Sequence, residues 1–201
     1  MNNFTVLNYQ GSKNNLRDFI YKNLKPYIKE GKAVFDIFSG SASVSSMFGQ
    51  EYLVYANDAE AYASIIADAL LNPADIPSPS AFLEQIEADY AVIKQALCIP
   101  VLDFINREKT ALKENNYREL SAVYDSYPTV WNQKYSDIIQ KELTVENIRA
   151  ADNYYLFTTY YASNYYGIGQ ALEIDCIIKL IHTRFPSCRN ALLMCLFYAM
   201  K

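Results

Sequence analysis

Two acidic residues and a glycine are spaced along the first third of the chain as in a nucleotide-binding corner. Asp36 closes an apolar run, and small residues follow it over positions 39–43, with Gly40 at the centre. Small residues let a backbone turn tightly and approach a ligand closely. A second apolar run ends at Asp58, and a carboxylate about 20 residues beyond a glycine loop is where a ribose hydroxyl pair is bound. The spacing predicts a site for a nucleoside-containing cofactor.

The position of Asp36 indicates which cofactor this is. A pyrophosphate at such a loop normally meets amide N–H groups and a helix N-terminus, and a carboxylate would repel it. An ammonium or a sulfonium group would be attracted instead, and S-adenosylmethionine carries both. The residues therefore predict an S-adenosylmethionine site. The alternative reading of the same pattern is a buried strand, a turn and a helix start with no ligand.

The elements that position these residues can be predicted from hydrophobic patterning. Residues 33–36 and 53–56 are rich in β-branched and aromatic side chains, which is typical of buried strands. Residues 44–48 resemble the start of a helix. A strand, a small-residue loop and a helix form the ligand-binding unit of an open α/β sheet. We therefore expect an α/β, Rossmann-like domain with a helical insertion.

Composition and charge restrict the class of protein. The chain has 201 residues, of which 51% are hydrophobic and 20% charged, so it is globular. Its net charge of −4 argues against nucleic acid binding, but residues 1–32 carry a balance of +4 and residues 33–100 a balance of −8. A basic face beside an acidic cofactor half is one reading of this asymmetry, and solvated helix faces are the other.

Cellular location is predicted from cysteine spacing and from the absence of leader-like segments. The four cysteines show no C-x-x-C spacing and fit reduced core residues of a cytoplasmic protein. No basic-then-apolar leader is present, and the late apolar run over residues 191–200 is too short to span a membrane. Nothing in the pattern suggests a metal site.

The middle of the chain is predicted to be helical. Pro77 and Pro79 end the helix expected after Asp58, and helical patterns follow over residues 81–96, 101–115 and 117–127. A short strand is conceivable over residues 129–131. We expect three parts: a cofactor-binding half (1–75), a helical insertion that is a candidate target-recognition region (76–150), and a tyrosine-rich segment with helices leading back (151–201).

The tyrosine-rich segment holds six tyrosines within residues 154–166. Aromatic rings there could stack on unpaired bases, and their hydroxyl groups could reach phosphates. A tyrosine-rich core helix is the ordinary alternative. Gly167 and Gly169 are expected to supply a turn before a helix over residues 171–185.

Three motifs together resemble a known family. An aromatic-x-Gly-x-Lys segment ends at Lys13, an Asp-x-Phe-x-Gly segment begins at Asp36, and an Asn-Asp pair ends at Asp58. This order is similar to that in the amino-terminal half of Dam-like DNA adenine-N6 methyltransferases. The resemblance implies a Rossmann-like, S-adenosylmethionine-dependent methyltransferase domain acting on double-stranded DNA, commonly in a restriction-modification system. Ala42 departs from the family pattern, which has its second glycine there; the methyl group would crowd the adenosine or tilt the loop.

The resemblance also implies roles for individual residues. The implied cofactor-binding residues are Tyr9, Gly11, Lys13, Asp36, Phe38, Ser39, Gly40 and Asp58. Residues implied to lie near the target base are Asn164, Tyr165 and Tyr166.

The family's catalytic motif, Asp/Asn-Pro-Pro-Tyr/Phe, holds the target amino group, and this sequence contains no Pro-Pro pair. We therefore assign no catalytic residue. By resemblance the motif would follow Lys201, so we expect a fragment, one part of a split enzyme that needs the missing carboxyl-terminal segment or a second subunit, or a degenerate protein. Two other readings stay open: a non-catalytic module that binds S-adenosylmethionine or DNA, and a small-molecule α/β enzyme with a nucleotide cofactor.

Overall fold

The computed structural model describes residues 13–98, 101–129 and 155–200. These residues form two compact units, one from residues up to 77 together with 185–200, and one from residues 78–184. The positions of Tyr9 and Gly11 lie outside the described residues, as does most of the strand that was conceivable over 129–131.

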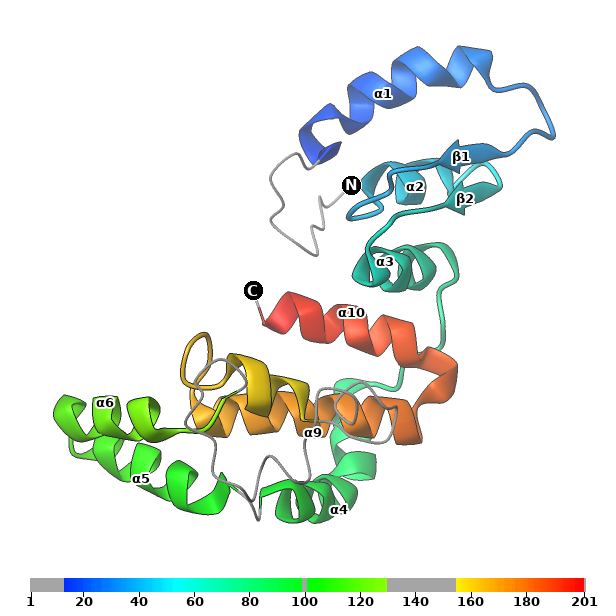
Figure 1. Ribbon diagram of the computed structural model, residues 1–201. Helices are drawn as coiled ribbons and strands as arrows, with labels where there is room; N and C mark the ends of the chain where they lie inside the picture. The colour runs from blue at the N-terminus through cyan, green and yellow to red at the C-terminus, as the bar shows by residue number, and fades with distance from the viewer. Residues whose placement is uncertain (1–12, 99–100, 130–154, 201) are drawn as a thin grey trace. The chain divides into compact units, whose positions relative to one another are not determined.

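The first unit is built around a short parallel sheet (Figure 1). Its elements in chain order are η1 (Lys13–Leu16), α1 (Arg17–Leu24), η2 (Lys25–Tyr27), β1 (Val34–Asp36), α2 (Ser43–Phe48), β2 (Val54–Ala56), α3 (Ala61–Leu71), η5 (Pro186–Cys188) and α10 (Arg189–Ala199). Strands β1 and β2 pair in parallel, with Asp36 opposite Ala56, and α2 is the crossover between them. The predicted strand–loop–helix–strand unit is therefore present.

The two faces of this sheet differ in their exposure. Val34 and Val54 are partly buried on one face. On the other face Phe35 and Tyr55 stack on each other with ring centroids 4.9 Å apart, yet both stay more than half exposed. Parallel sheets are normally covered on both faces. This face is thus an open apolar surface of the first unit.

Helices α3 and α10 pack together and form the core of the first unit. Ala42, Ile66 and Ala67 are buried in one cluster, against which Met194 and Phe197 of α10 pack. Asn190 at the start of α10 donates a hydrogen bond of 2.7 Å to Asp68 of α3. Helix α10 therefore supports the loop that contains Ala42.

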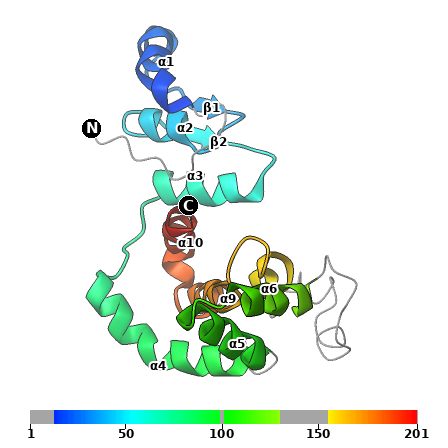
Figure 2. The same ribbon diagram turned by 90° about the vertical axis from the view of Figure 1, so that its left-hand side faces the viewer.

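The second unit is helical, as the sequence pattern predicts (Figure 2). It contains α4 (Pro79–Cys98), α5 (Leu102–Lys113), α6 (Tyr117–Ser126), the short π-helix η4 (Phe157–Tyr161) and α9 (Ile168–Arg184). The three helices expected over residues 81–127 are confirmed. Helix α4 packs on α9, and α5 packs on both α6 and α9. Val123, Leu172 and Cys176 lie in the buried core of this unit.

Two observations bear on the expected class of protein. No described helix is both long enough and apolar enough to cross a membrane. Among the described cysteines Cys176 and Cys188 are buried, but Cys195 is exposed on α10, so the prediction that all the cysteines lie in the core was wrong for Cys195. The described fold is mostly helical with a small parallel sheet, which confirms the α/β prediction only in its coarse form.

Candidate functional site

The carboxyl ends of β1 and β2 bring the predicted acids and the glycine together. The backbone N–H of Gly40 donates to Oδ2 of Asp58 at 2.8 Å. The strand ends are joined by two further bonds, from Asn57 N–H to the Asp36 carbonyl (2.8 Å) and from Ser39 N–H to the Asn57 carbonyl (3.0 Å). The loop after β1 and the acid after β2 therefore form one connected structure.

The Asp58 carboxylate is held in its ionised form by this network. The N–H of Gly40 is the main cause that lowers its pKa, followed by the N–H of Glu60, which donates to Oδ1 at 3.1 Å. The positive charge of Lys13 lowers the pKa further. Asp58 therefore carries its charge throughout the neutral pH range.

Lys13 lies at the same loop. Its Nζ donates to the carbonyl of Phe38 at 2.9 Å, across 25 residues of sequence. Phe38 itself is 73% exposed. Lys13 thus ties the start of η1 to the loop and places a positive charge near Asp58.

The loop backbone is unusual at two positions. Gly40 and Ala42 both have positive φ, 52° and 54°, in the left-handed region. Apart from its two neighbours in the chain, no described residue would lie within 4 Å of a Cβ atom at Gly40. The hydroxyl of Ser39 is buried and has no hydrogen-bond partner among the described residues. A buried hydroxyl without a partner is uncommon in folded proteins, and a bound water or polar ligand is one way to satisfy it.

Asp36 makes a contact that the sequence did not suggest. Its Oδ2 accepts a hydrogen bond of 2.7 Å from the hydroxyl of Ser45 on α2. Among the side chains and backbone groups that the structure describes, none donates to its other oxygen. Nothing in a single sequence marks Ser45, because serine is common in the first turn of any helix.

Ala42 is completely buried at the N-cap of α2, in the cluster with Ile66 and Ala67. Its methyl group is therefore enclosed by the core, which favours an effect on loop conformation over direct crowding of a ligand. An L-residue pays about 1–2 kcal/mol in the left-handed region. Two effects favour alanine over glycine at this position. Burial of the methyl group contributes about 0.8 kcal/mol, and the lower entropy of the unfolded chain contributes about 0.4–1 kcal/mol, so together they are comparable to the backbone cost.

The Ala42→Gly variant is therefore expected to change the free energy of unfolding by less than about 1 kcal/mol, because relief of strain offsets the lost methyl group. Ala67 is the matched control, since it is a buried helical alanine of the same cluster. Ala67→Gly should cost about 1.5–2 kcal/mol from helix propensity and the lost methyl group. Urea denaturation measures both values, and an equal loss in the two variants would contradict this account of Ala42.

The candidate target-base residues lie in a turn between η4 and α9. Ser163, with φ of 65°, supplies the left-handed residue of this turn. Tyr165 is 77% exposed, and its ring packs edge-on against that of Tyr161 with the ring centroids 5.7 Å apart. Tyr166 is partly buried, and its ring packs against that of Phe157. Asn164 is exposed. The structure thus presents Asn164 and Tyr165 to solvent and uses Tyr166 in packing.

A buried glutamate of α5 anchors this turn. Glu108 is 4% exposed, and its carboxylate accepts hydrogen bonds from the backbone N–H groups of Ile168 (2.7 Å) and Gly169 (2.8 Å) and from the hydroxyl of Tyr124 (2.8 Å). A Cβ atom at Gly167 would lie 2.9 Å from Oε1 of Glu108. The glycine at 167 is therefore needed for close approach of the carboxylate. The prediction that Gly167 and Gly169 supply the turn was wrong: the turn lies at residues 163–165, Gly169 is already within α9, and neither glycine has a positive φ.

A second buried carboxylate holds η4. Asp175 of α9 accepts from the N–H of Phe157 (3.0 Å) and from both the N–H (2.7 Å) and hydroxyl (2.6 Å) of Thr158. Burial raises the pKa of Asp175 to about 6, and these hydrogen bonds oppose the shift. Both carboxylate oxygens accept hydrogen bonds from η4, so Asp175 anchors the tyrosine-rich segment to α9.

Comparison with known proteins places these residues in a family context. A family model described as D12 class N6 adenine-specific DNA methyltransferase matches residues 9–168, which is most of the chain. The modification methylase LlaI of Lactococcus lactis subsp. lactis is 32% identical over 79 residues. This match covers 39% of the present chain and 13% of that protein, so the chain corresponds to a small part of its relative. No solved structure matches the chain.

The family model spans both the loop with its two strand-end acids and the turn that precedes α9. A match over that length is far more specific than any of the three short motifs. The chain belongs to the family of D12 class N6 adenine-specific DNA methyltransferases.

Proposed function

We propose that this chain supplies the cofactor-binding and target-recognition parts of a site-specific DNA adenine-N6 methyltransferase that uses S-adenosylmethionine and is paired with a restriction enzyme. The observation that carries the proposal is the Gly40–Asp58 hydrogen bond at the carboxyl edge of the parallel sheet. The family and the modification methylase among its relatives support the reaction and the biological setting.

The Gly40–Asp58 bond distinguishes between classes of nucleotide cofactor. In a phosphate-binding loop the backbone N–H groups point at the ligand. Here the N–H of Gly40 is already bonded to a carboxylate, and the charges of Asp36 and Asp58 lie on the same loop and strand edge. Phosphate would meet negative charge and one donor fewer. A nucleoside with a cationic side chain and no phosphate fits this donor and acceptor set.

Each residue of the loop has a role in this proposal. The Asp36 carboxylate accepts from the ammonium group, Asp58 accepts from the ribose hydroxyls, and the Ser39 hydroxyl gains the partner that it lacks among the described residues. Lys13 fixes the loop through the Phe38 carbonyl. Tyr9 and Gly11 belong to the same proposed site by sequence. The bound cofactor supplies an activated methyl group on its sulfonium.

The second unit is proposed to contact double-stranded DNA. Enzymes that modify a base first take it out of the stack. Tyr165 is exposed and offers a ring for stacking with an unpaired base, and Asn164 next to it offers hydrogen-bonding groups. The buried carboxylates of Glu108 and Asp175 stabilise the segments on either side of this turn through hydrogen bonds. Tyr166 contributes to the same segment through its packing on Phe157.

The first unit also requires a complement. Two parallel strands with an exposed Phe35–Tyr55 face are too little for a stable open sheet. We propose that a segment bearing the Asp-Pro-Pro-Tyr type of motif, in the same chain or in a second subunit, completes the sheet and holds the target amino group.

A non-catalytic module that binds S-adenosylmethionine or DNA is the second candidate. The observation in its favour is the lack of any Pro-Pro pair in the 201 residues. The two candidates share the cofactor site and differ only in turnover.

Binding of S-adenosylmethionine tests the feature common to both. Titration calorimetry on the chain should detect binding, and Asp58→Asn should weaken it at least about tenfold, because a charge-assisted bond to the ribose is lost. Asp68→Asn on α3, whose carboxylate bonds to Asn72 and Asn190 in the same unit, is the control and should bind as the wild type does. Unchanged affinity in Asp58→Asn would remove Asp58 from the site.

A further inference from the structure

We propose that Ser45 is a positioning residue for cofactor binding: its hydroxyl orients the Asp36 carboxylate toward the ammonium group of the cofactor's amino-acid moiety. This inference rests on the proposed function, since it concerns the same site. Neither the sequence motifs nor the family resemblance assigns Ser45 a role.

The Ser45 hydroxyl donates one hydrogen bond, to Asp36. Ser45 lies in the first turn of α2 and is 0% exposed. Its hydroxyl donates to Oδ2 of Asp36 at 2.7 Å. A hydroxyl group has one proton to donate, so this bond uses it fully.

The consequence for Asp36 follows from the two oxygens of its carboxylate. One oxygen is fixed to α2, and the other has no donor among the described residues. The bond from Ser45 therefore restrains the carboxylate in one orientation, and the proposal assigns its other oxygen to the ligand. Removing the hydroxyl would let the carboxylate rotate and would cost the ligand part of a preorganised contact.

The neighbouring serine behaves differently. Ser46 is the next residue of α2, and its hydroxyl donates to the carbonyl of Ser43 at 3.2 Å within the same helix. It makes no bond to Asp36. The pair Ser45 and Ser46 thus provides two equal chemical deletions in one helix, one of which should affect the site.

Comparing two ligands separates the contribution of the ammonium group to binding from that of the nucleoside. S-Adenosylhomocysteine carries the amino-acid group, whereas 5′-methylthioadenosine has the same adenosine and thioether without it. If Ser45 acts through Asp36 on the ammonium, Ser45→Ala should weaken S-adenosylhomocysteine about fivefold to tenfold by calorimetry and leave 5′-methylthioadenosine within about twofold. The ratio of the two affinities is insensitive to a partly unfolded sample.

A double-mutant cycle completes the experiment. In an Asp36→Asn background, adding Ser45→Ala should cause little further loss, because the two residues act as one unit. Ser46→Ala should leave both affinities unchanged. If Ser45→Ala folds poorly, Ser45→Cys, whose thiol is a weak donor of similar size, should show the same change in ratio.

The outcomes separate this inference from the proposal beneath it. An equal loss for both ligands, or additive losses in the cycle, would overturn the role of Ser45 while leaving the cofactor site in place. Failure of the wild-type chain to bind either ligand would overturn the proposed function and this inference with it.

Discussion

Residues 1–201 on their own are expected to transfer no methyl group to DNA above the background without protein. The adenine amino group is a poor nucleophile, since its lone pair is delocalised into the ring. Orientation of the reacting groups and electrostatic stabilisation supply most of an enzyme's acceleration. The described residues provide loop and strand-end groups for the cofactor, but no Pro-Pro motif to hold the amino group occurs in the chain.

The measurement is incorporation of tritiated methyl groups into mixed-sequence duplex DNA. Addition of a segment with the Asp-Pro-Pro-Tyr type of motif, fused or as a second chain, should start transfer to adenine. The same segment with the motif's acidic residue changed to alanine is the control and should fail.

Robust incorporation by residues 1–201 alone would mean that another carboxylate has taken over the catalytic role. Asp152 and Asp175 are the candidates nearest the tyrosine-rich segment. Asp152 lies outside the described residues. Asp175 is 1% exposed, and both of its oxygens accept hydrogen bonds from Phe157 and Thr158, so a substrate could not reach it. The structure therefore leaves Asp175 poorly suited to that role.

The parts of the fold that depend on local pattern could be predicted from the sequence. Helices α4, α5 and α6 follow amphipathic periodicity and end near prolines or turn residues, so their existence was predictable. The β1–α2–β2 unit was predictable too, because parallel strands must be joined by a crossover and a small-residue loop marks where it begins.

Contacts between residues distant in sequence could not be predicted in this way. Helix α9 begins at Ile168, three residues before the expected start, because Glu108 accepts the N–H groups of Ile168 and Gly169 from 60 and 61 residues away. Likewise, the Ser45–Asp36 bond depends on how α2 folds back against β1. A pattern of residue types carries no signal for either pairing.

The left-handed conformations show a related limit. A glycine in the sequence suggests a positive φ at position 40. Ala42 and Ser163 adopt the same left-handed region, although neither residue type suggests it. Their conformations are imposed by the burial of Ala42 in the core and by the turn that links η4 to α9. Tertiary context decides these positions, and local preference opposes them.

Conservative replacement of Glu108 is expected to destabilise the second unit strongly. In Glu108→Gln one acceptor oxygen becomes an amide donor that faces a backbone N–H group of Ile168 or Gly169. A buried donor left without an acceptor costs about 1–3 kcal/mol, and apposed donors add repulsion. We expect a loss of about 2–3 kcal/mol in the free energy of unfolding.

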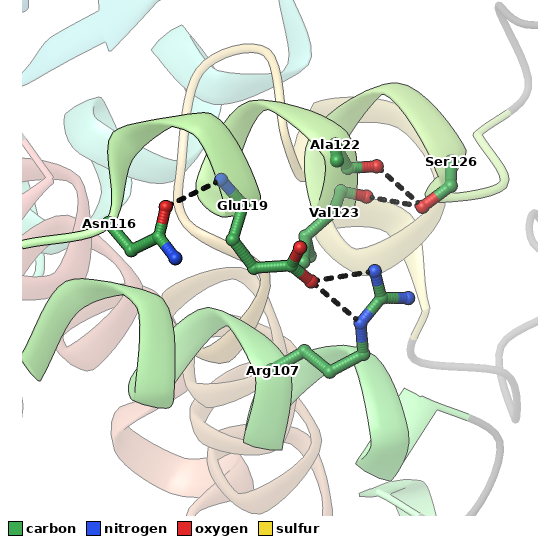
Figure 3. Close-up of polar contacts among 6 residues, drawn as sticks. All are labelled: Arg107, Asn116, Glu119, Ala122, Val123 and Ser126. Carbon is green, nitrogen blue, oxygen red and sulfur yellow. Dashed lines mark hydrogen bonds and ion pairs between the residues drawn. The ribbon is translucent and has the colours of Figure 1, made fainter. Parts of the chain in front are cut away.

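Glu119 of α6 is the matched control (Figure 3). It pairs with Arg107 of α5 at 2.9 Å, but the two side chains are 43% and 39% exposed, and the cap of α6 comes from Asn116, which accepts from the Glu119 N–H. An exposed ion pair is worth about 0–1 kcal/mol, so Glu119→Gln should cost less than about 1 kcal/mol. Both glutamates bridge α5 to a neighbouring segment, and they differ mainly in burial.

Denaturant unfolding, with hydrogen exchange at the amides of Ile168 and Gly169, measures the difference. Glu108→Gln should speed exchange at these two amides more than at Val123 in the core of the same unit, because the start of α9 loses its acceptor before the core loosens.

DNA affinity should fall as well, since the same carboxylate fixes the turn that exposes Tyr165. Equal, small losses in Glu108→Gln and Glu119→Gln would mean that water replaces the carboxylate at the start of α9, and the turn would then owe its shape to Ser163 and to the packing of Tyr166 on Phe157.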